Sequence, residues 1–241
     1  SYWKPVQAYC EQFPEKVKFL NFLDVNDFKA GALNEALPYI HTQTDLILTV
    51  DADYELDKNA LKFVNSDFTH NKHNLIQYPQ HYNNLDTHCP VNVEFNHYFE
   101  FYSKSAANES LTLPTGTLSA INRESLEELG GWPTASITED AQLGIQLFEN
   151  NFSAKYIDRV IGSGAAPCEP VEFIKQRERW IYGNFQNLIY LLKSKKLPVA
   201  MKTKLIPQLT CWFNFNLFSY LILLASAISI SFNLFTAASV L

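Results

Sequence analysis

The stretch DLILTVDADYELD, residues 45–57, is the clearest strand pattern in this chain. Residues 46–50 form a short apolar run of the kind found in strands that are buried in a parallel sheet. Asp51 and Asp53 follow directly, so two negative charges lie one residue apart where the strand ends. Ligands of such sheets bind beyond the carboxyl ends of the strands. The stretch therefore predicts a strand that leads into a site for a positively charged group.

The two aspartates allow three interpretations. A calcium loop of the EF-hand type over residues 51–62 is set aside, because Leu56 and Lys62 stand where that loop needs Gly and a bidentate Glu. A solvated surface loop needs no ligand at all. The third interpretation is a divalent cation, Mg²⁺ or Mn²⁺, that one or both carboxylates hold while it bridges a diphosphate.

The rest of the chain alternates between strand and helix patterns. Strands are expected at residues 17–24, 46–50, 74–78, 115–121 and 154–157. Helices are expected at residues 28–40, 59–68, 91–106, 123–129, 139–151 and 171–192. Strands that alternate with helices indicate an α/β sandwich.

Charge and cysteine content exclude some classes of protein. The net charge of −6 argues against a nucleic-acid partner, because phosphate binding requires a basic face. The four cysteines lie far apart and form no CxxC pair. This spacing predicts reduced thiols rather than a disulfide framework or a zinc site.

The C-terminal part of the chain has a different composition. Residues 209–241 contain no charged side chain, and about 20 apolar residues span a bilayer, so a transmembrane segment is predicted there. A buried core helix is the alternative, but such helices seldom run so long without charge. Residues 191–207 mix lysines with apolar residues, which predicts an interfacial amphipathic helix. Lysines beside a membrane span favour the cytoplasmic side. The preceding residues are therefore expected in the cytoplasm, docked on the cell membrane.

The segment SITEDAQLGIQL, residues 136–147, carries a second pair of acids at the start of a predicted helix. One interpretation is helix capping by Thr138, with Glu139 and Asp140 interacting favourably with the helix dipole. The other is a general base, since a hydroxyl nucleophile needs a carboxylate within hydrogen-bond reach to take its proton.

The segment FIKQRERWIYGN, residues 173–184, is the most specific of the three. On a helix Gln176, Arg179 and Trp180 lie at i, i+3 and i+4 and share one face, whereas Arg177 points elsewhere. An Arg and a Trp on one face suit a pyrophosphate and the face of a sugar ring. An amphipathic helix with a packed Trp and a snorkelling Arg is the alternative.

Five stretches carry a family resemblance: FKAGALNEAL, TVDAD, LPTGTLSAINRESLEELGGW, SITEDAQLG and QRERW, in this order. Together they resemble family 2 glycosyltransferases, specifically the membrane-bound cellulose, hyaluronan and mannan synthase-like group. The resemblance implies an α/β fold of the GT-A (Rossmann-like) type over residues 1–190. It also implies inverting transfer from a nucleotide-diphosphate sugar, such as UDP-glucose, to a growing β-linked polysaccharide.

On the donor side, the resemblance implies that Asp51 and especially Asp53 help to hold the metal ion and the diphosphate. Arg179 is implied to bind the diphosphate, and Lys29 to lie near the nucleotide. The resemblance makes Asp140 the catalytic base.

On the acceptor side, the resemblance implies that Trp180 forms a platform under the acceptor sugar. Gln176 belongs to the same motif. Glu139 is implied to lie in the acceptor site, and Gly116 and Thr117 are expected to line its pocket.

The resemblance has further implications for the whole protein. The whole protein is expected to cross the cell membrane several times and to have export subunits as accessory partners. The first nucleotide-binding strand of the family is expected before residue 1, so residues 1–241 alone are expected to show weak or no turnover.

The sequence leaves two other functions open. One is transfer of a single sugar to a lipid acceptor, as in ceramide glucosyltransferase-like enzymes. The other is that of a catalytically inactive subunit which binds glycans or nucleotide sugars.

Overall fold

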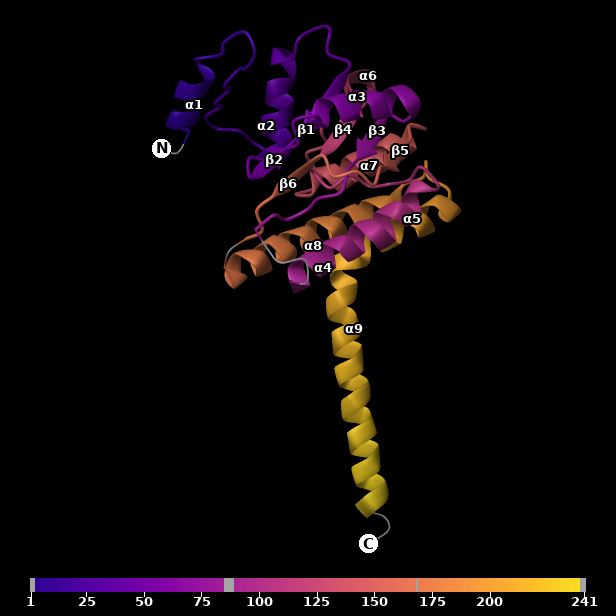
Figure 1. Cartoon of the computed structure of the whole chain (residues 1–241). Coiled ribbons are helices and arrows are strands. Elements are labelled where there is room, and N and C mark those ends of the chain that lie inside the picture. The colour runs from indigo at the N-terminus through magenta and orange to yellow at the C-terminus, as the bar shows by residue number, and fades with distance from the viewer. Residues whose placement is uncertain (1–2, 85–88, 168, 239–241) are drawn as a thin grey trace.

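A computed structural model of the protein describes residues 3–84, 89–167 and 169–238 (Figure 1). The strands are β1 (Leu46–Thr49), β2 (Tyr54–Leu56), β3 (Leu75–Gln77), β4 (Ser119–Asn122), β5 (Ala154–Tyr156) and β6 (Gly162–Gly164). The helices before β4 are α1 (Lys4–Cys10), α2 (Phe28–Ala36), η1 (Leu37–Tyr39), α3 (Ala60–His70), α4 (Pro90–His97), η2 (Tyr98–Ser103) and α5 (Lys104–Ala107). The helices after β4 are α6 (Arg123–Glu128), α7 (Glu139–Glu149), α8 (Pro170–Lys193) and α9 (Val199–Ala238).

The main sheet has four strands in the order β1-β4-β3-β5. Strand β4 is antiparallel to both β1 and β3, and only β3 and β5 pair in parallel. The prediction that residues 46–50 belong to a parallel sheet was therefore wrong, because β4, the strand that pairs with β1, runs antiparallel to it. A short apolar run reports burial, and it carries no information on the direction of the neighbouring strand. Strands β2 and β6 form a separate antiparallel pair.

The core lies on both faces of this sheet. Successive residues of a strand point to opposite faces, and the paired residues Leu75 and Ile121 belong to one hydrophobic cluster while Ile76 and Ala120 belong to another. The first cluster contains buried side chains of α6, α7, α8 and α9, and the second contains those of α3. The α/β sandwich predicted from the sequence is confirmed.

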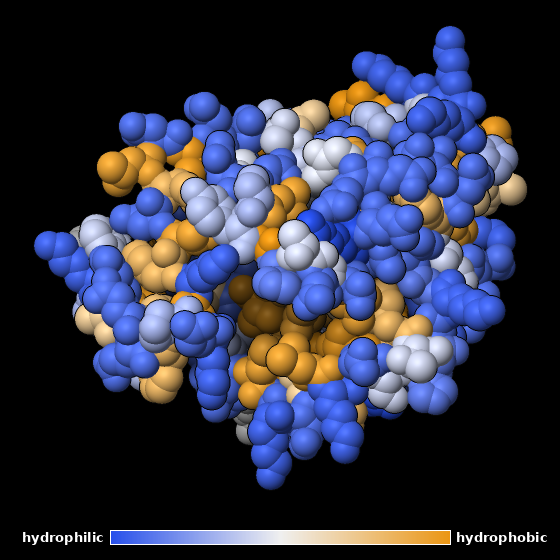
Figure 2. All heavy atoms as spheres, turned by 90° about the horizontal axis from the view of Figure 1, so that it is seen from above, coloured by the Kyte–Doolittle hydropathy of each residue, from blue (hydrophilic) through white to orange (hydrophobic). Residues whose placement is uncertain are grey.

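A layer of helices separates the sheet from the C-terminal helix. In Figure 1, α4 and α8 lie side by side beneath the sheet, and α9 leaves this body as a long helix. The predicted helix over residues 91–106 is divided into α4, a π-helical turn (η2) and α5. Residues 17–24, a predicted strand, are irregular. Seen from above, the surface is largely hydrophilic and contains a hollow with an apolar floor (Figure 2).

Residues 191–207 do not form the predicted single interfacial helix. They comprise the end of α8, an irregular turn and the first turns of α9. Pro198 disfavours helix at the residue before it, which explains the break. Leu191, Leu197 and Leu205 are buried in the main core cluster, so these apolar residues pack against the protein itself.

The predicted transmembrane segment, residues 209–241, falls on the C-terminal part of α9. The side chains of 214–223 and 230–238, and the whole of 239–241, lie outside the described part. Among the residues that the structure describes, no helix is long and apolar enough to cross a membrane. Cys10, Cys89 and Cys211 are free thiols, and Cys168 lies outside the described residues.

Candidate active site

A cavity of about 510 Å³ opens where β1 ends, between the start of α7 and the N-terminal half of α8. Nine of the ten predicted site residues line it: Lys29, Asp51, Asp53, Gly116, Glu139, Asp140, Gln176, Arg179 and Trp180. Segments far apart in the sequence therefore converge on one cavity. Thr117 is the exception, because it is buried beneath the cavity wall and does not line it.

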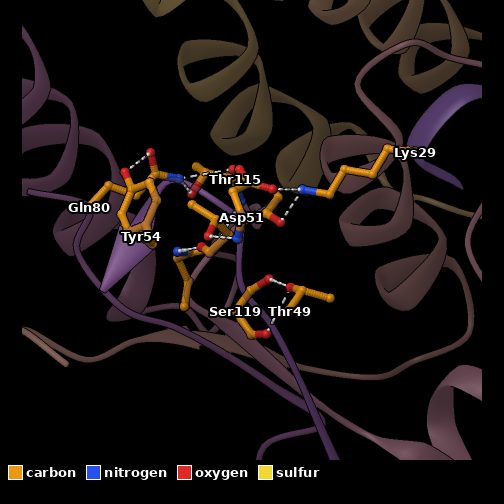
Figure 3. Close-up of polar contacts among 10 residues, drawn as sticks. Lys29, Thr49, Asp51, Tyr54, Gln80, Thr115 and Ser119 are labelled. Carbon is orange, nitrogen blue, oxygen red and sulfur yellow. Dashed lines mark hydrogen bonds and ion pairs between the residues drawn. The ribbon is translucent and has the colours of Figure 1, made fainter. Parts of the chain in front are cut away.

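Asp51 lies at the end of β1 and is held by two groups (Figure 3). Its carboxylate accepts a hydrogen bond from Lys29 of α2 and forms an ion pair with it. Lys29 Nζ also donates to the carbonyl oxygen of Gly116, at 2.8 Å. The backbone N–H of Asp51 donates to Thr117 Oγ1, at 2.9 Å. Thr117 thus positions the strand end, which differs from its predicted place in the acceptor pocket.

The loop that precedes β4 is held by two glutamines that the sequence analysis missed. Gln80 Nε2 donates to the carbonyl oxygen of Thr115 at 3.0 Å and to its hydroxyl at 2.8 Å. The backbone N–H of Thr115 donates to Gln77 Oε1 at 2.9 Å. Tyr54 donates its hydroxyl hydrogen to Gln80 Oε1, at 3.3 Å. The sequence offered a signal for Gln77 only, as a polar residue within the apolar run LIQY, and the structure buries this residue fully.

Two tyrosines also line the cavity. Burial raises the pKa of Tyr82 to about 12, and burial together with the charges of Tyr82, Asp53 and Asp51 raises the pKa of Tyr54 well above its usual range. Both phenols therefore stay protonated at neutral pH, and Tyr54 acts as a hydrogen-bond donor to Gln80.

The residues at the end of β1 fit a divalent cation. Asp51 and Asp53 both line the cavity, and two carboxylates that share an ion with phosphate oxygens are the donor set that Mg²⁺ and Mn²⁺ prefer. Among the described residues, no group of three or more His, Cys, Asp or Glu side chains is arranged to hold a metal ion. Phosphate oxygens of a ligand and water molecules are the further donors that such an ion takes.

Two acids stand at the start of α7, the buried Glu139 and the partly buried Asp140. Glu139 is only 8 % exposed. Burial and the charge of Glu139 raise the pKa of Asp140 to about 7, and burial also raises the pKa of Glu139. A carboxylate with a pKa near neutrality suits a general base.

Thr138 does not cap α7 through its side chain, so that part of the capping interpretation was wrong. Its hydroxyl and its carbonyl oxygen instead each accept a hydrogen bond from Asn187 Nδ2 of α8, at 2.9 Å. Asn187 is fully buried. The loop before the two acids is therefore fixed to α8 by a buried side chain.

Helix α8 carries Gln176, Arg179 and Trp180 into the same cavity, as the i, i+3, i+4 spacing predicts. Trp180 also packs against a cluster of buried side chains that includes Phe95 and Trp212, so it is both a wall of the cavity and part of the core. Arg177 does not line the cavity and is buried on another side of the helix.

Comparison with known proteins identifies the family. The family described as "Glycosyl transferase family group 2" matches residues 46–241. The chain is 28% identical over 167 residues to the UDP-forming cellulose synthase 1 catalytic subunit of Komagataeibacter xylinus, covering 66% of this chain and 22% of that protein. It is 30% identical over 165 residues to a UDP-forming cellulose synthase catalytic subunit of Dictyostelium discoideum, covering 64% of this chain and 15% of that protein.

The chain also resembles a solved structure, the mannosyltransferase PcManGT from Pyrobaculum calidifontis in complex with GDP-Man and Mn²⁺. The TM-score is 0.67 at 20% sequence identity, over 88% of this chain and 57% of that one. The fold is therefore α/β and GT-A-like. The match over residues 46–241 shows that this chain belongs to glycosyl transferase family group 2, whose members are nucleotide-sugar glycosyltransferases.

Proposed function

We propose that this chain carries the active site of an inverting glycosyltransferase that adds sugars from a nucleotide-diphosphate donor to a growing β-linked polysaccharide. One observation carries the proposal: the partly buried acid Asp140, the ring of Trp180 and the charged side chains Asp53 and Arg179 line one cavity. The similarity to cellulose synthases supports a β-linked glycan as the product. The chain spans about a fifth of those proteins, so we assign the activity to the full-length protein.

The chemical step follows from this arrangement. The acceptor sugar stacks on Trp180, and one of its hydroxyl groups gives its proton to the Asp140 carboxylate. The hydroxyl oxygen forms a bond to the anomeric carbon on the face opposite the nucleotide, and the bond from that carbon to the diphosphate breaks. Attack from the opposite face inverts the anomeric centre. An α-linked donor therefore gives a β-glycoside.

The leaving diphosphate gains negative charge as the bond breaks. Arg179 lines the cavity and stabilises this charge with guanidinium N–H donors in the bidentate geometry that suits phosphate. Asp51 and Asp53 would hold a Mg²⁺ or Mn²⁺ ion, which supplies Lewis-acid stabilisation of the same charge when bound. Lys29, which pairs with Asp51 in this structure, adds a further positive group at the donor end of the cavity.

The proposal is tested with the full-length protein and Mn²⁺ or Mg²⁺. UDP-glucose, UDP-N-acetylglucosamine and GDP-mannose are offered in turn, and both nucleotide release and product length are followed. Metal-dependent release from one donor with a long product supports the proposal. A single-sugar lipid product moves the assignment to a lipid glycosyltransferase. Release from none of the donors contradicts transfer and favours the inactive binding subunit.

A glycine in the cavity wall provides the first prediction. Gly116 has φ +80°, and a Cβ atom there would lie 2.9 Å from Asp140 Oδ2. Gly116→Ala is expected to lower the free energy of unfolding by about 1–2 kcal/mol because of the left-handed backbone. It is also expected to lower the transfer rate about tenfold, because the new methyl group displaces the Asp140 carboxylate.

Gly130→Ala is the matched control for this prediction. Gly130 has φ +82°, but a Cβ atom there would meet nothing within 4 Å. The unfolding free energy of Gly130→Ala, measured with guanidinium chloride, is expected to fall as much as that of Gly116→Ala. The transfer rate of Gly130→Ala is expected to stay unchanged. Equal transfer rates in the two variants would show that contact with Asp140 is unimportant.

A further inference from the structure

Arg177 is a buried cation beside the cavity that the mechanism above does not use. The residue is only 7 % exposed. Its Nε and Nη2 atoms donate to Glu94 Oε2 of α4, at 3.0 and 2.7 Å. Its Nη1 atom donates to Gln176 Oε1, at 2.8 Å. The guanidinium group thus connects α4 to a residue that lines the cavity.

The same guanidinium group lies among four aromatic rings. Its central carbon is 4.2 Å from the ring centroid of Phe173 and 4.3 Å from that of Trp180. The centroids of Phe95 and Trp212 each lie 5.0 Å away. These distances are within the range of cation–π attraction, which is strongest when the cation is shielded from water.

The rings also contact one another. The centroid of Trp180 lies 5.7 Å from that of Phe95 and 5.1 Å from that of Trp212. Trp180 is therefore held from behind by Arg177 and two aromatic rings, while it also lines the cavity. A change at Arg177 would remove one of the contacts that hold the Trp180 ring.

A contribution to stability alone is a weak reason for this arrangement. A buried ion pair loses much of its Coulombic attraction to the cost of desolvation, and apolar side chains of similar volume often replace it without loss of stability. The placement of Arg177 against Gln176 and Trp180, two residues of the cavity, therefore points to a role in orienting them.

We propose that Arg177 is a positioning residue for the acceptor sugar. It sets the tilt of the Trp180 ring, and it holds Gln176 Oε1 so that the amide N–H₂ of Gln176 faces the cavity. Arg179, on the cavity side of the helix, acts on the donor instead. The inference rests on the proposed function, since it requires Trp180 to be the platform for the acceptor.

The test removes both partners of the ion pair, so that no buried charge is left alone. In the double variant Arg177→Met/Glu94→Gln, KM for a cello-oligosaccharide acceptor is expected to rise about tenfold, because a small displacement of positioning groups has large effects. KM for the donor is expected to stay within about twofold of wild type, because Arg179 and the aspartates are untouched. An unchanged acceptor KM in the folded double variant would overturn the inference.

A second ion pair, partly buried, supplies the matched control. Arg159 Nη1 donates to both carboxylate oxygens of Asp67 at 2.8 Å, and its guanidinium carbon lies 5.0 Å from the ring centroid of Phe63. Neither residue lines the cavity. Arg159→Met/Asp67→Asn is expected to leave both KM values unchanged. A rise in acceptor KM in this control as well would show that the effect is a general loss of packing.

Two further measurements cover a failure of folding or of turnover. Arg177→Lys keeps the charge and lacks the planar fork, so its acceptor KM is expected between wild type and the double variant. The acceptor KM of Arg177→Lys is used as the test if the double variant does not fold. If wild type transfers no sugar, the proposed function fails on its own. Quenching of tryptophan fluorescence by cellohexaose then tests Arg177, and equal affinity in wild type and variants would overturn its role.

Discussion

Replacing Asp140 by Asn is expected to lower the rate of sugar transfer by about 10³-fold, because a positioned general base contributes roughly 10²–10⁴-fold to such a step. The amide has the volume of the carboxylic acid, so the cavity keeps its shape. Its oxygen can still accept the hydrogen bond that Asp140 Oδ1 receives from the backbone N–H of Ala141, at 2.8 Å. The amide cannot take a proton from the acceptor hydroxyl.

The loss is measured as nucleotide release with saturating donor and acceptor. Donor affinity, measured by calorimetry, is expected to stay near the wild-type value, because Asp140 does not contact the leaving group in the proposed mechanism. Glu124→Gln, which removes an exposed carboxylate from the first turn of α6, serves as the control and is expected to be fully active. A transfer rate above one tenth of wild type in Asp140→Asn would rule out Asp140 as the base.

The pH dependence follows from the same residue. A base must be ionised to act, and burial raises the pKa of Asp140 to about 7. The rate is therefore expected to fall as the pH drops below about 7 and to level off above it. The charge of Glu139 contributes to the raised pKa, so Glu139→Gln is expected to move the midpoint of the profile to lower pH. An unmoved midpoint would contradict the coupling of these two acids.

Asp53→Asn is expected to have the second largest effect, a loss of about 10²-fold in transfer rate. A bound metal ion stabilises a departing oxyanion by several kcal/mol, and each 1.4 kcal/mol or so is a factor of ten. The amide keeps an oxygen but loses the charge that attracts the cation. Asp53 is the cleaner choice of the two aspartates, because Asp51 also pairs with Lys29.

Donor affinity is measured with and without Mn²⁺, which distinguishes a role of Asp53 in holding the metal ion from other roles. Wild type is expected to bind the donor more tightly with Mn²⁺, and Asp53→Asn is expected to lose most of that difference. Glu55→Gln is the control, because it removes an exposed carboxylate from β2 that lies two residues from Asp53 and outside the cavity. This variant is expected to keep the full difference in donor affinity with and without Mn²⁺. If Asp53→Asn keeps the full response to Mn²⁺, the metal is held elsewhere.

Local patterns predicted most of the cavity. The i, i+3, i+4 spacing placed Gln176, Arg179 and Trp180 on one face, and the acids that follow β1 were expected at a strand end. Such predictions succeed because helix and strand periodicity is a property of neighbouring residues.

Long-range contacts explain what the sequence did not reveal. The direction of β4 depends on how the chain returns to the sheet, and that return leaves no mark on the strand itself. Arg177 was predicted only to point away from the cavity, because its partner Glu94 belongs to a distant helix. Thr117 was predicted to line the acceptor pocket, yet its hydroxyl accepts a hydrogen bond from the backbone of Asp51.

The unbroken course of α8 limits how this enzyme can change in evolution. Trp180 lines the cavity, and further along the same helix Asn187 holds the loop that precedes the two acids. An α-helix advances about 1.5 Å and turns about 100° per residue. Insertion or deletion of one residue between these positions would therefore rotate Trp180, the proposed acceptor platform, away from Asp140, the proposed base. Relatives with the same chemistry are expected to keep this interval fixed in length, while the exposed face of the helix is free to vary in sequence.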